Sequence, residues 1–101
     1  MSRYSKDDVA RATAEMQLAT YQIKAALQGG LAPDSSQAMD GAEAHLLSIS
    51  KWWYECTYEI HKGLADMYVN DVRFTDFYEK QLPGLAKFMH DAIYANTESK
   101  L

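Results

Sequence analysis

The spacing of the apolar residues is the feature that most restricts the fold of this chain. In the first third they recur at steps of three and four, which is one buried stripe of an α-helix formed by Val9, Ala12, Met16, Ala19, Ile23 and Leu27. No segment alternates apolar and polar residues at a period of two, and no hairpin dipeptide separates two β-rich runs. The sequence therefore predicts an all-α protein.

Capping and breaking residues divide the chain into five predicted helices of unequal length. Ser5 and Asp8 form a capping-box-like start, and Gly29-Gly30 ends the first helix. The second helix starts at Ser35 or Ser36 and runs to about Tyr54; Thr57 caps the third, Asp71 caps a short fourth, and Pro83 lies in the first turn of the last. The later stripes are Met39, Ala42, Leu46, Ile49 and Trp53; Ile60, Leu64, Met67 and Tyr68; Phe74, Phe77 and Tyr78; and Leu85, Phe88, Met89, Ala92 and Ile93.

The chain length fits a single domain. We expect residues 1–101 to form it, with frayed ends at residues 1–4 and 97–101. Two long helices combined with shorter ones favour an irregular, globin-like packing over an even four-helix bundle. A chain of 101 residues buries enough surface to be stable without disulfides or a metal ion.

Charge and cysteine content exclude several classes of protein. The net charge of −4 argues against a nucleic-acid surface, and the single cysteine cannot form an internal disulfide. No apolar run approaches the roughly 20 residues of a membrane span, and the polar N-terminus lacks the apolar core of a signal peptide. We therefore expect a soluble protein of the reducing cytoplasm, with neither a nucleic-acid nor a membrane partner and with a monomer favoured.

The aromatic residues are concentrated in the C-terminal half. Only Tyr4 and Tyr21 lie in the first half, and the other ten lie between Trp52 and Tyr94. This aromatic area, together with Met67 and Met89, is suited to an apolar cleft for a bulky planar molecule. The alternative is that these side chains form the core, as stripes at helical spacing usually do.

Cys56 has the most distinctive chemistry of any residue in the chain. It precedes the helix start predicted at Thr57, where backbone N–H groups and the helix dipole favour a thiolate, and His61 follows five residues later. A thiolate beside an aromatic cleft would capture an electrophilic ligand. The alternative is that Cys56 is a small buried hydrophobic residue.

Other kinds of site find little support in the sequence. A cysteine hydrolase needs an orienting residue and an oxyanion hole, and no glycine-rich elbow supplies one, so we expect no enzyme. His45, Cys56, His61 and His90 match no zinc spacing, and nothing beyond the histidines suggests haem, so we expect no metal or cofactor. Gly29-Gly30 follows a helix, whereas phosphate-binding loops precede one.

Several ordered motifs identify the chain as similar to a known family. They are the segments Trp52 to Leu64, Met67 to Phe74, Pro83 to Phe88 and Asp91 to Asn96, with Tyr78 between them. Tyr4 to Asp8, Pro33-Asp34-Ser35, His45 and Ile49 match more loosely. These residues resemble the TipAS-type antibiotic-recognition domain, the C-terminal effector half of a group of MerR-family multidrug regulators.

The resemblance implies an all-α, globin-like fold without haem and a cleft for bulky hydrophobic antibiotics, such as thiopeptides or albicidin. It also implies that Cys56 matches the cysteine that adds to a dehydroalanine of the drug in thiopeptide-binding members. Together with the aromatic pattern, it leads us to expect ligand contacts from His45, Trp52, Trp53, Tyr54, Cys56, Tyr58, His61, Met67, Tyr68, Phe74, Tyr78, Phe88 and Met89.

The 101 residues contain neither the DNA-binding winged helix nor the coiled-coil helix of these regulators. We therefore expect either a stand-alone protein that sequesters drugs or the effector-sensing domain of a transcriptional regulator. The alternative hypothesis is a helical interaction module whose partner is another protein and which has no small-molecule ligand.

Overall fold

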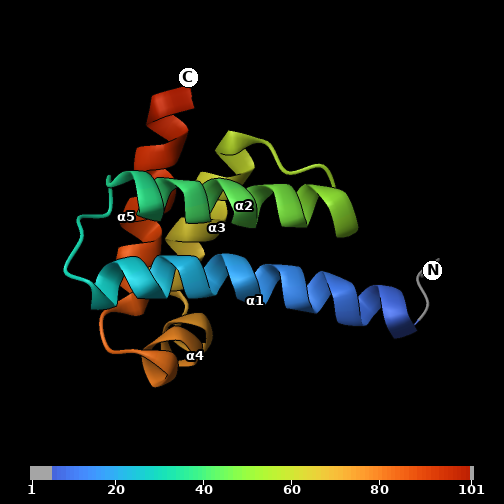
Figure 1. Ribbon diagram of the computed structural model, residues 1–101, viewed down its shortest axis with the longest axis horizontal. Coiled ribbons are helices and arrows are strands. Elements are labelled where there is room, and N and C mark those ends of the chain that lie inside the picture. Colours follow the sequence, from blue (N-terminus) through green and yellow to red (C-terminus); the bar gives the residue numbers. More distant parts are fainter. Residues whose placement is uncertain (1–5, 101) are drawn as a thin grey trace.

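The structure is a computed structural model that describes residues 6–100. Over these residues the all-α prediction is confirmed, because every regular element is a helix and no strand occurs. The five helices are α1 (Lys6–Gln28), α2 (Ser36–Trp52), α3 (Tyr58–Asn70), α4 (Val72–Gln81) and α5 (Leu85–Lys100). In Figure 1, α1 and α2 lie side by side and run in opposite directions, and α5 crosses them.

The end of α1 is set by Gly30. This glycine adopts the left-handed conformation with φ of 74°, which costs a residue without a Cβ very little. The amide of Gly30 donates to the Leu27 carbonyl, and the amide of Leu31 donates to the Ala26 carbonyl. This hydrogen-bond pattern is a Schellman motif, and it confirms the predicted end of the first helix.

Side chains cap the starts of three helices. The hydroxyls of Ser35 and Thr57 accept hydrogen bonds from the amides three residues further on, at the starts of α2 and α3. The Asp71 carboxylate accepts from the amide of Arg73 at the start of α4. The predicted capping roles of Thr57 and Asp71 are confirmed.

The start of α5 differs from the prediction. Pro83 lies before the helix, in a turn whose left-handed residue is Gly84 with φ of 88°. A side chain of the preceding helix binds the amides at the start of α5: the Glu79 carboxylate accepts from the amide of Gly84, just before the helix, at 2.9 Å and from that of Ala86 in its first turn at 3.1 Å. A carboxylate at a helix start also interacts favourably with the helix dipole.

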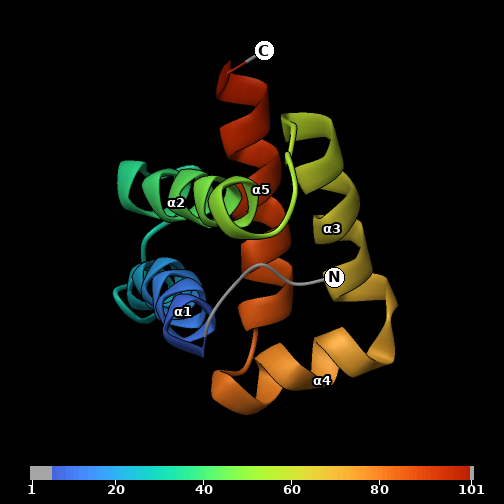
Figure 2. The same ribbon diagram turned by 90° about the vertical axis from the view of Figure 1, so that its right-hand side faces the viewer.

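Helix α5 occupies the middle of the molecule. It packs against each of the other four helices and lies between α2 and α3 in Figure 2. Its predicted stripe is buried throughout and consists of Leu85, Phe88, Met89, Ala92 and Ile93. The core predicted for the last helix is therefore confirmed.

A small residue allows α1 and α2 to approach closely. A Cβ atom added to Gly41 of α2 would lie 2.7 Å from Cγ1 of Ile23 on α1. The side chains of Gln22 and Gln37 reinforce the pair, because each donates to the backbone carbonyl of the other, at 3.2 and 3.4 Å.

The predicted fraying of the C-terminal tail is wrong for residues 97–100. Helix α5 continues to Lys100, and Thr97 is fully buried. The Thr97 hydroxyl donates to the Tyr58 carbonyl at 3.5 Å, and the Asn96 amide donates to the Glu43 carboxylate at 2.9 Å. These polar contacts with α2 and α3 hold the last turns in place. The predicted N-cap Ser5, residues 1–4 and Leu101 lie outside the described residues.

The predicted stripes of α2 and α3 are confirmed only in part. On α2 the stripe is buried apart from Met39, which is half-buried, and Trp53, which is 48% exposed while Trp52 is buried. On α3 the buried face is formed by His61, Ala65 and Tyr68, and the predicted stripe residues Ile60 and Met67 are exposed. Packing of α3 against α5 selects this face, and the next residue along a helix points about 100° away from it.

Two glycines in helix interiors give a test of this packing. Ala at Gly63 meets open space on the exposed face of α3, so we expect Gly63→Ala to stabilise the protein by about 0.5–1 kcal/mol. Ala at Gly41 collides with Ile23, so we expect Gly41→Ala to destabilise it by about 1–3 kcal/mol. Urea unfolding measures both free energies. Equal effects at the two glycines would contradict close packing of α1 on α2.

Candidate functional site

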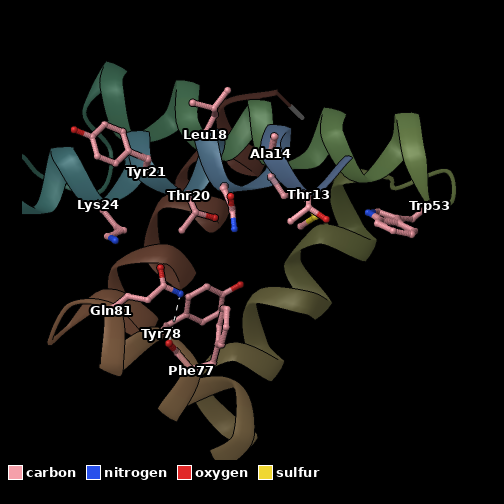
Figure 3. A pocket seen from close by; sticks show the side chains of 12 residues that line it. Thr13, Ala14, Leu18, Thr20, Tyr21, Lys24, Trp53, Phe77, Tyr78 and Gln81 are labelled. Carbon is pink, nitrogen blue, oxygen red and sulfur yellow. Dashed lines mark hydrogen bonds between the residues drawn. The ribbon is translucent and has the colours of Figure 1, made fainter. Parts of the chain in front are cut away.

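An apolar groove separates α1 from α4. Its volume is about 860 Å³. Figure 3 shows side chains of α1 on one wall and of α4 on the facing wall, with Trp53 at one end. The lining residues are Thr13, Ala14, Met16, Gln17, Leu18, Thr20, Tyr21, Lys24, Trp53, Phe77, Tyr78 and Gln81.

A second hollow extends the groove toward α3. It has a volume of about 490 Å³ and shares three lining residues with the groove, Met16, Phe77 and Tyr78. The remaining lining residues are Tyr68, Arg73 and Phe74. The two hollows therefore adjoin each other, and together we call them the α1–α4 groove.

Large apolar side chains line this groove without being buried by the fold. Leu18 and Tyr21 on α1 are 68% and 64% exposed, and Phe77 on α4 is 59% exposed. Exposed apolar side chains that gather around one concavity are typical of a ligand or partner site.

A polar contact holds the N-terminal half of α1 against the end of α2. The Glu15 carboxylate accepts hydrogen bonds from the Trp52 indole at 2.9 Å and from the Lys51 ammonium at 3.1 Å. The pKa of Glu15 lies below its usual value, chiefly because of the hydrogen bond from Trp52. The ammonium of Lys51 and the guanidinium of Arg11 lie over the Trp52 ring, 5.0 and 5.6 Å from its centroid. Glu15 and Trp52 thus fix the wall of α1 relative to Trp53.

Three aromatic rings form the floor of the second hollow. The Tyr68 centroid lies 5.0 Å from the Tyr78 ring and 5.7 Å from the Phe74 ring, in edge-to-face and tilted arrangements. Burial raises the pKa of both tyrosines, so their hydroxyls stay neutral at physiological pH. The floor therefore consists of uncharged aromatic rings.

Cys56 does not line the groove. It is 4% exposed and lies in a small apolar cluster with Leu46 and Ile49, against which Met16 packs. Its thiol faces the Thr57 carbonyl at 3.7 Å. Desolvation raises the pKa of the thiol, which is the opposite of the thiolate expected at a helix start.

His45 and His61 form a buried pair. Nδ1 of His45 lies 2.9 Å from Nε2 of His61, and the two rings are stacked. Burial lowers the pKa of both imidazoles, so both are neutral at pH 7 and one donates a hydrogen bond to the other. The remaining ring nitrogens, Nε2 of His45 and Nδ1 of His61, have no hydrogen-bond partner in the described protein.

The structure separates the predicted ligand contacts into three groups. Trp53, Tyr68, Phe74 and Tyr78 line the α1–α4 groove. A second group is buried in the core, namely His45, Trp52, Cys56, His61, Phe88 and Met89. Tyr54, Tyr58 and Met67 are at least partly exposed but do not line the groove, and the Tyr58 hydroxyl donates to Glu43.

Sequence reasoning missed the wall that α1 contributes. Eight of the lining residues belong to this helix, from Thr13 to Lys24. Leu18 and Tyr21 do not belong to the predicted core stripe of α1, and large apolar residues away from the core face of a helix are the signal that was available.

The third histidine lies on the surface of α5. Nδ1 of His90 is 2.9 Å from the Asp91 carboxylate, and its Nε2 is 3.3 Å from the Asp66 carboxylate. Among residues 6–100 no three His, Cys, Asp or Glu side chains gather closely enough to hold a metal ion.

Comparison with known proteins identifies the family of this chain. The sequence model of the TipAS antibiotic-recognition domain matches residues 1–96. The chain belongs to the TipAS family. Its structure superimposes with a TM-score of 0.87 on TipAS from Streptomyces lividans in complex with the thiopeptide nosiheptide, at 41% identity over 96% of this chain and 68% of that one.

Further relatives agree with this assignment. The antibiotic-binding domain of a TipA-class multidrug resistance regulator superimposes with a TM-score of 0.81, at 41% identity over 89% of this chain and 96% of that one. The transcriptional activator TipA of Streptomyces coelicolor is 43% identical over 92% of this chain. The activator mta of Bacillus subtilis is 35% identical over 91% of it.

These matches confirm the predicted globin-like all-α fold and the resemblance to TipAS domains. The chain spans 37% of the length of TipA and 35% of that of mta. Over the part of the chain that the structure describes, no helix is both long and apolar enough to cross a membrane.

The buried histidine pair makes stability depend on pH. Both histidines titrate near pH 6.5 in the unfolded chain, whereas burial lowers their pKa values in the folded protein. As the pH falls, the two histidines therefore take up protons in the unfolded chain before they do so in the folded protein. The stabilisation that comes from keeping this pair neutral is complete above pH 6.5 and is lost as the pH falls below it. We expect a loss of about 2 kcal/mol for each histidine between pH 6.5 and pH 5 in urea unfolding.

Replacement of both residues, His45→Met with His61→Met, should flatten this dependence. NMR of the folded wild-type protein gives an independent check. A His45 or His61 ring that titrates between pH 7 and pH 5 without unfolding would contradict the prediction.

Proposed function

We propose that this chain binds bulky hydrophobic or aromatic antibiotics in the α1–α4 groove. The observation that carries the proposal is the groove lined by exposed apolar side chains, in a chain that belongs to the TipAS family. A relative with the same fold binds the thiopeptide nosiheptide, which supports a ligand of this size and class.

The shape and chemistry of the groove fit recognition by stacking. Trp53 presents its ring at one end of the groove, and Phe77 and Tyr78 present theirs along the wall formed by α4. Aromatic rings give large rigid contact areas at low cost in conformational entropy. Leu18, Tyr21 and Phe77 in its walls are exposed, so the groove is open to solvent and accommodates ligands larger than an enclosed cavity would admit.

Two biological roles are compatible with such binding. The chain acts either as the effector-sensing part of a transcriptional regulator or as a protein that sequesters its drug. The regulators TipA and mta support the first role, because their homology covers most of this chain. In both roles the domain binds its ligand without catalysing a reaction, and cytoplasmic placement follows from the role.

Covalent capture by Cys56 is an additional step of the proposal. The thiol would add across the carbon–carbon double bond of a dehydroalanine, with sulfur bonding to the terminal carbon and a proton going to the other carbon. Met16 both lines the groove and packs against the cluster that contains Cys56. Movement of Met16 would therefore connect the buried thiol with a ligand in the groove.

Matched variants test the groove. Phe77→Ala removes a ring from the groove wall, and Val72→Ala truncates a side chain on the same helix that is 67% exposed and does not line the groove. We expect Phe77→Ala to weaken nosiheptide binding at least fivefold in titration calorimetry, because truncated aromatic contacts cost more than about 1 kcal/mol. Val72→Ala should bind like the wild type.

Equal affinities for the two variants would contradict binding in the groove. Wild-type protein that neither binds nosiheptide nor gains thermal stability with it, or with thiostrepton and albicidin, would contradict antibiotic binding as a whole. That result would favour the interaction-module hypothesis instead.

The state of the thiol gives a separate test of capture. Because Cys56 is buried with a raised pKa, we expect slow alkylation by iodoacetamide at pH 7.5 and fast alkylation in urea. Met16→Ala should accelerate both this alkylation and the formation of a thiostrepton adduct, measured by mass spectrometry. Val9→Ala is the control on the same helix, because Val9 is exposed and does not line the groove. Cys56→Ser should abolish the adduct. An adduct that persists in Cys56→Ser would refute capture by this residue.

A further inference from the structure

The charges around the α1–α4 groove are distributed unevenly. The chain as a whole has 14 acidic and 10 basic residues. None of the residues lining either hollow is acidic, and the only charged side chains among them are the cations Lys24 and Arg73. An acidic protein thus presents a groove whose formal charge is positive.

The two cations differ in their partners. The Arg73 guanidinium is held by the Asp71 carboxylate through contacts of 2.9 and 3.2 Å, so its charge is largely compensated. Lys24 forms no ion pair with any residue in the described part of the chain. Its side chain is half-buried, and Figure 3 shows its ammonium group pointing from α1 into the groove.

Neutral polar groups surround the Lys24 end of the groove. Thr20 lies one helical turn before Lys24, and Gln81 faces both from α4 (Figure 3). The Gln81 amide is oriented by a hydrogen bond of 3.5 Å to the Phe77 carbonyl. The Trp53 ring lies at the opposite end of the groove (Figure 3), so the cation and the aromatic indole are at different ends.

We infer that Lys24 determines ligand specificity, and that the preferred ligand is an apolar aromatic molecule with an anionic group, such as a carboxylate, at one end. This inference rests on the proposed function of the groove and adds the charge of its ligand. An ammonium that is partly desolvated and lacks a counter-ion gains more from an anionic ligand than an exposed lysine does. The absence of lining carboxylates removes the repulsion that an anion would otherwise meet.

Two fluorescent dyes that share one ring system measure how much an anionic group on the ligand adds to its affinity. 1-Anilinonaphthalene-8-sulfonate is N-phenyl-1-naphthylamine with an added sulfonate, so the pair measures the contribution of an anionic group on the same aromatic frame. We expect the wild-type protein to bind the sulfonate about tenfold more tightly than the neutral dye, as a charge-assisted contact predicts. In 1 M NaCl this preference should fall, because salt screens the interaction.

Variants at Lys24 test whether this residue causes the preference for the sulfonate dye. Lys24→Met should reduce the ratio of the two dissociation constants to about one, and Lys24→Arg should retain most of it. Lys80→Met is the matched control, since Lys80 is an exposed residue of α4 that does not line the groove. It should keep the wild-type ratio. Phe77→Ala should weaken both dyes by similar factors without changing their ratio.

The outcomes separate this inference from the proposed function. Binding of both dyes with a ratio that Lys24→Met leaves unchanged, or that Lys80→Met lowers equally, overturns the role of Lys24 and leaves the apolar groove intact. Failure of both dyes to bind the wild-type protein overturns the groove as a ligand site, and both proposals then fall together.

Discussion

Burial of α5 by the four other helices is the constraint on which the rest of the structure depends. Met89 and Ile93 are completely inaccessible, so this helix must be surrounded before its apolar stripe is removed from water. The requirement extends to its end, where Asn96 and Thr97 are buried and bonded to α2 and α3. A helix that is covered along its whole length fixes the positions of its neighbours.

The groove follows from how those neighbours are attached. Helix α1 packs on α2 and α5, whereas α4 packs on α3 and α5. The two helices share α5 as a neighbour, are otherwise held by different helices, and face each other across the α1–α4 groove. The close contact at Gly41 and the hydrogen bond from Trp52 to Glu15 keep α1 against α2. The outer face of α1 is consequently available to a ligand, and its exposed apolar residues have no partner in the core.

The side chains with the most reactive chemistry are buried in the interior of the protein. The sequence pattern and the family resemblance led us to expect ligand contacts from Cys56, His45 and His61, but the fold buries all three and keeps them uncharged at neutral pH. Their neighbours lie on other helices: Leu46 for the thiol, and for each histidine the other member of the pair. The residues next to them in sequence do not predict such contacts, because desolvation depends on atoms that are distant along the chain.

The sequence by itself determined the helices, most of their caps and the family. Gly30, Thr57 and Asp71 end or begin helices through contacts within a few residues, and the stripe of α5 has the period of a helix, so short-range rules were sufficient. Only the tertiary structure decided which face of α3 is buried, that Trp52 rather than Trp53 is covered, and that α1 supplies one wall of the groove. Adjacent residues of a helix point about 100° apart, so the direction in which the neighbouring helices lie selects between them.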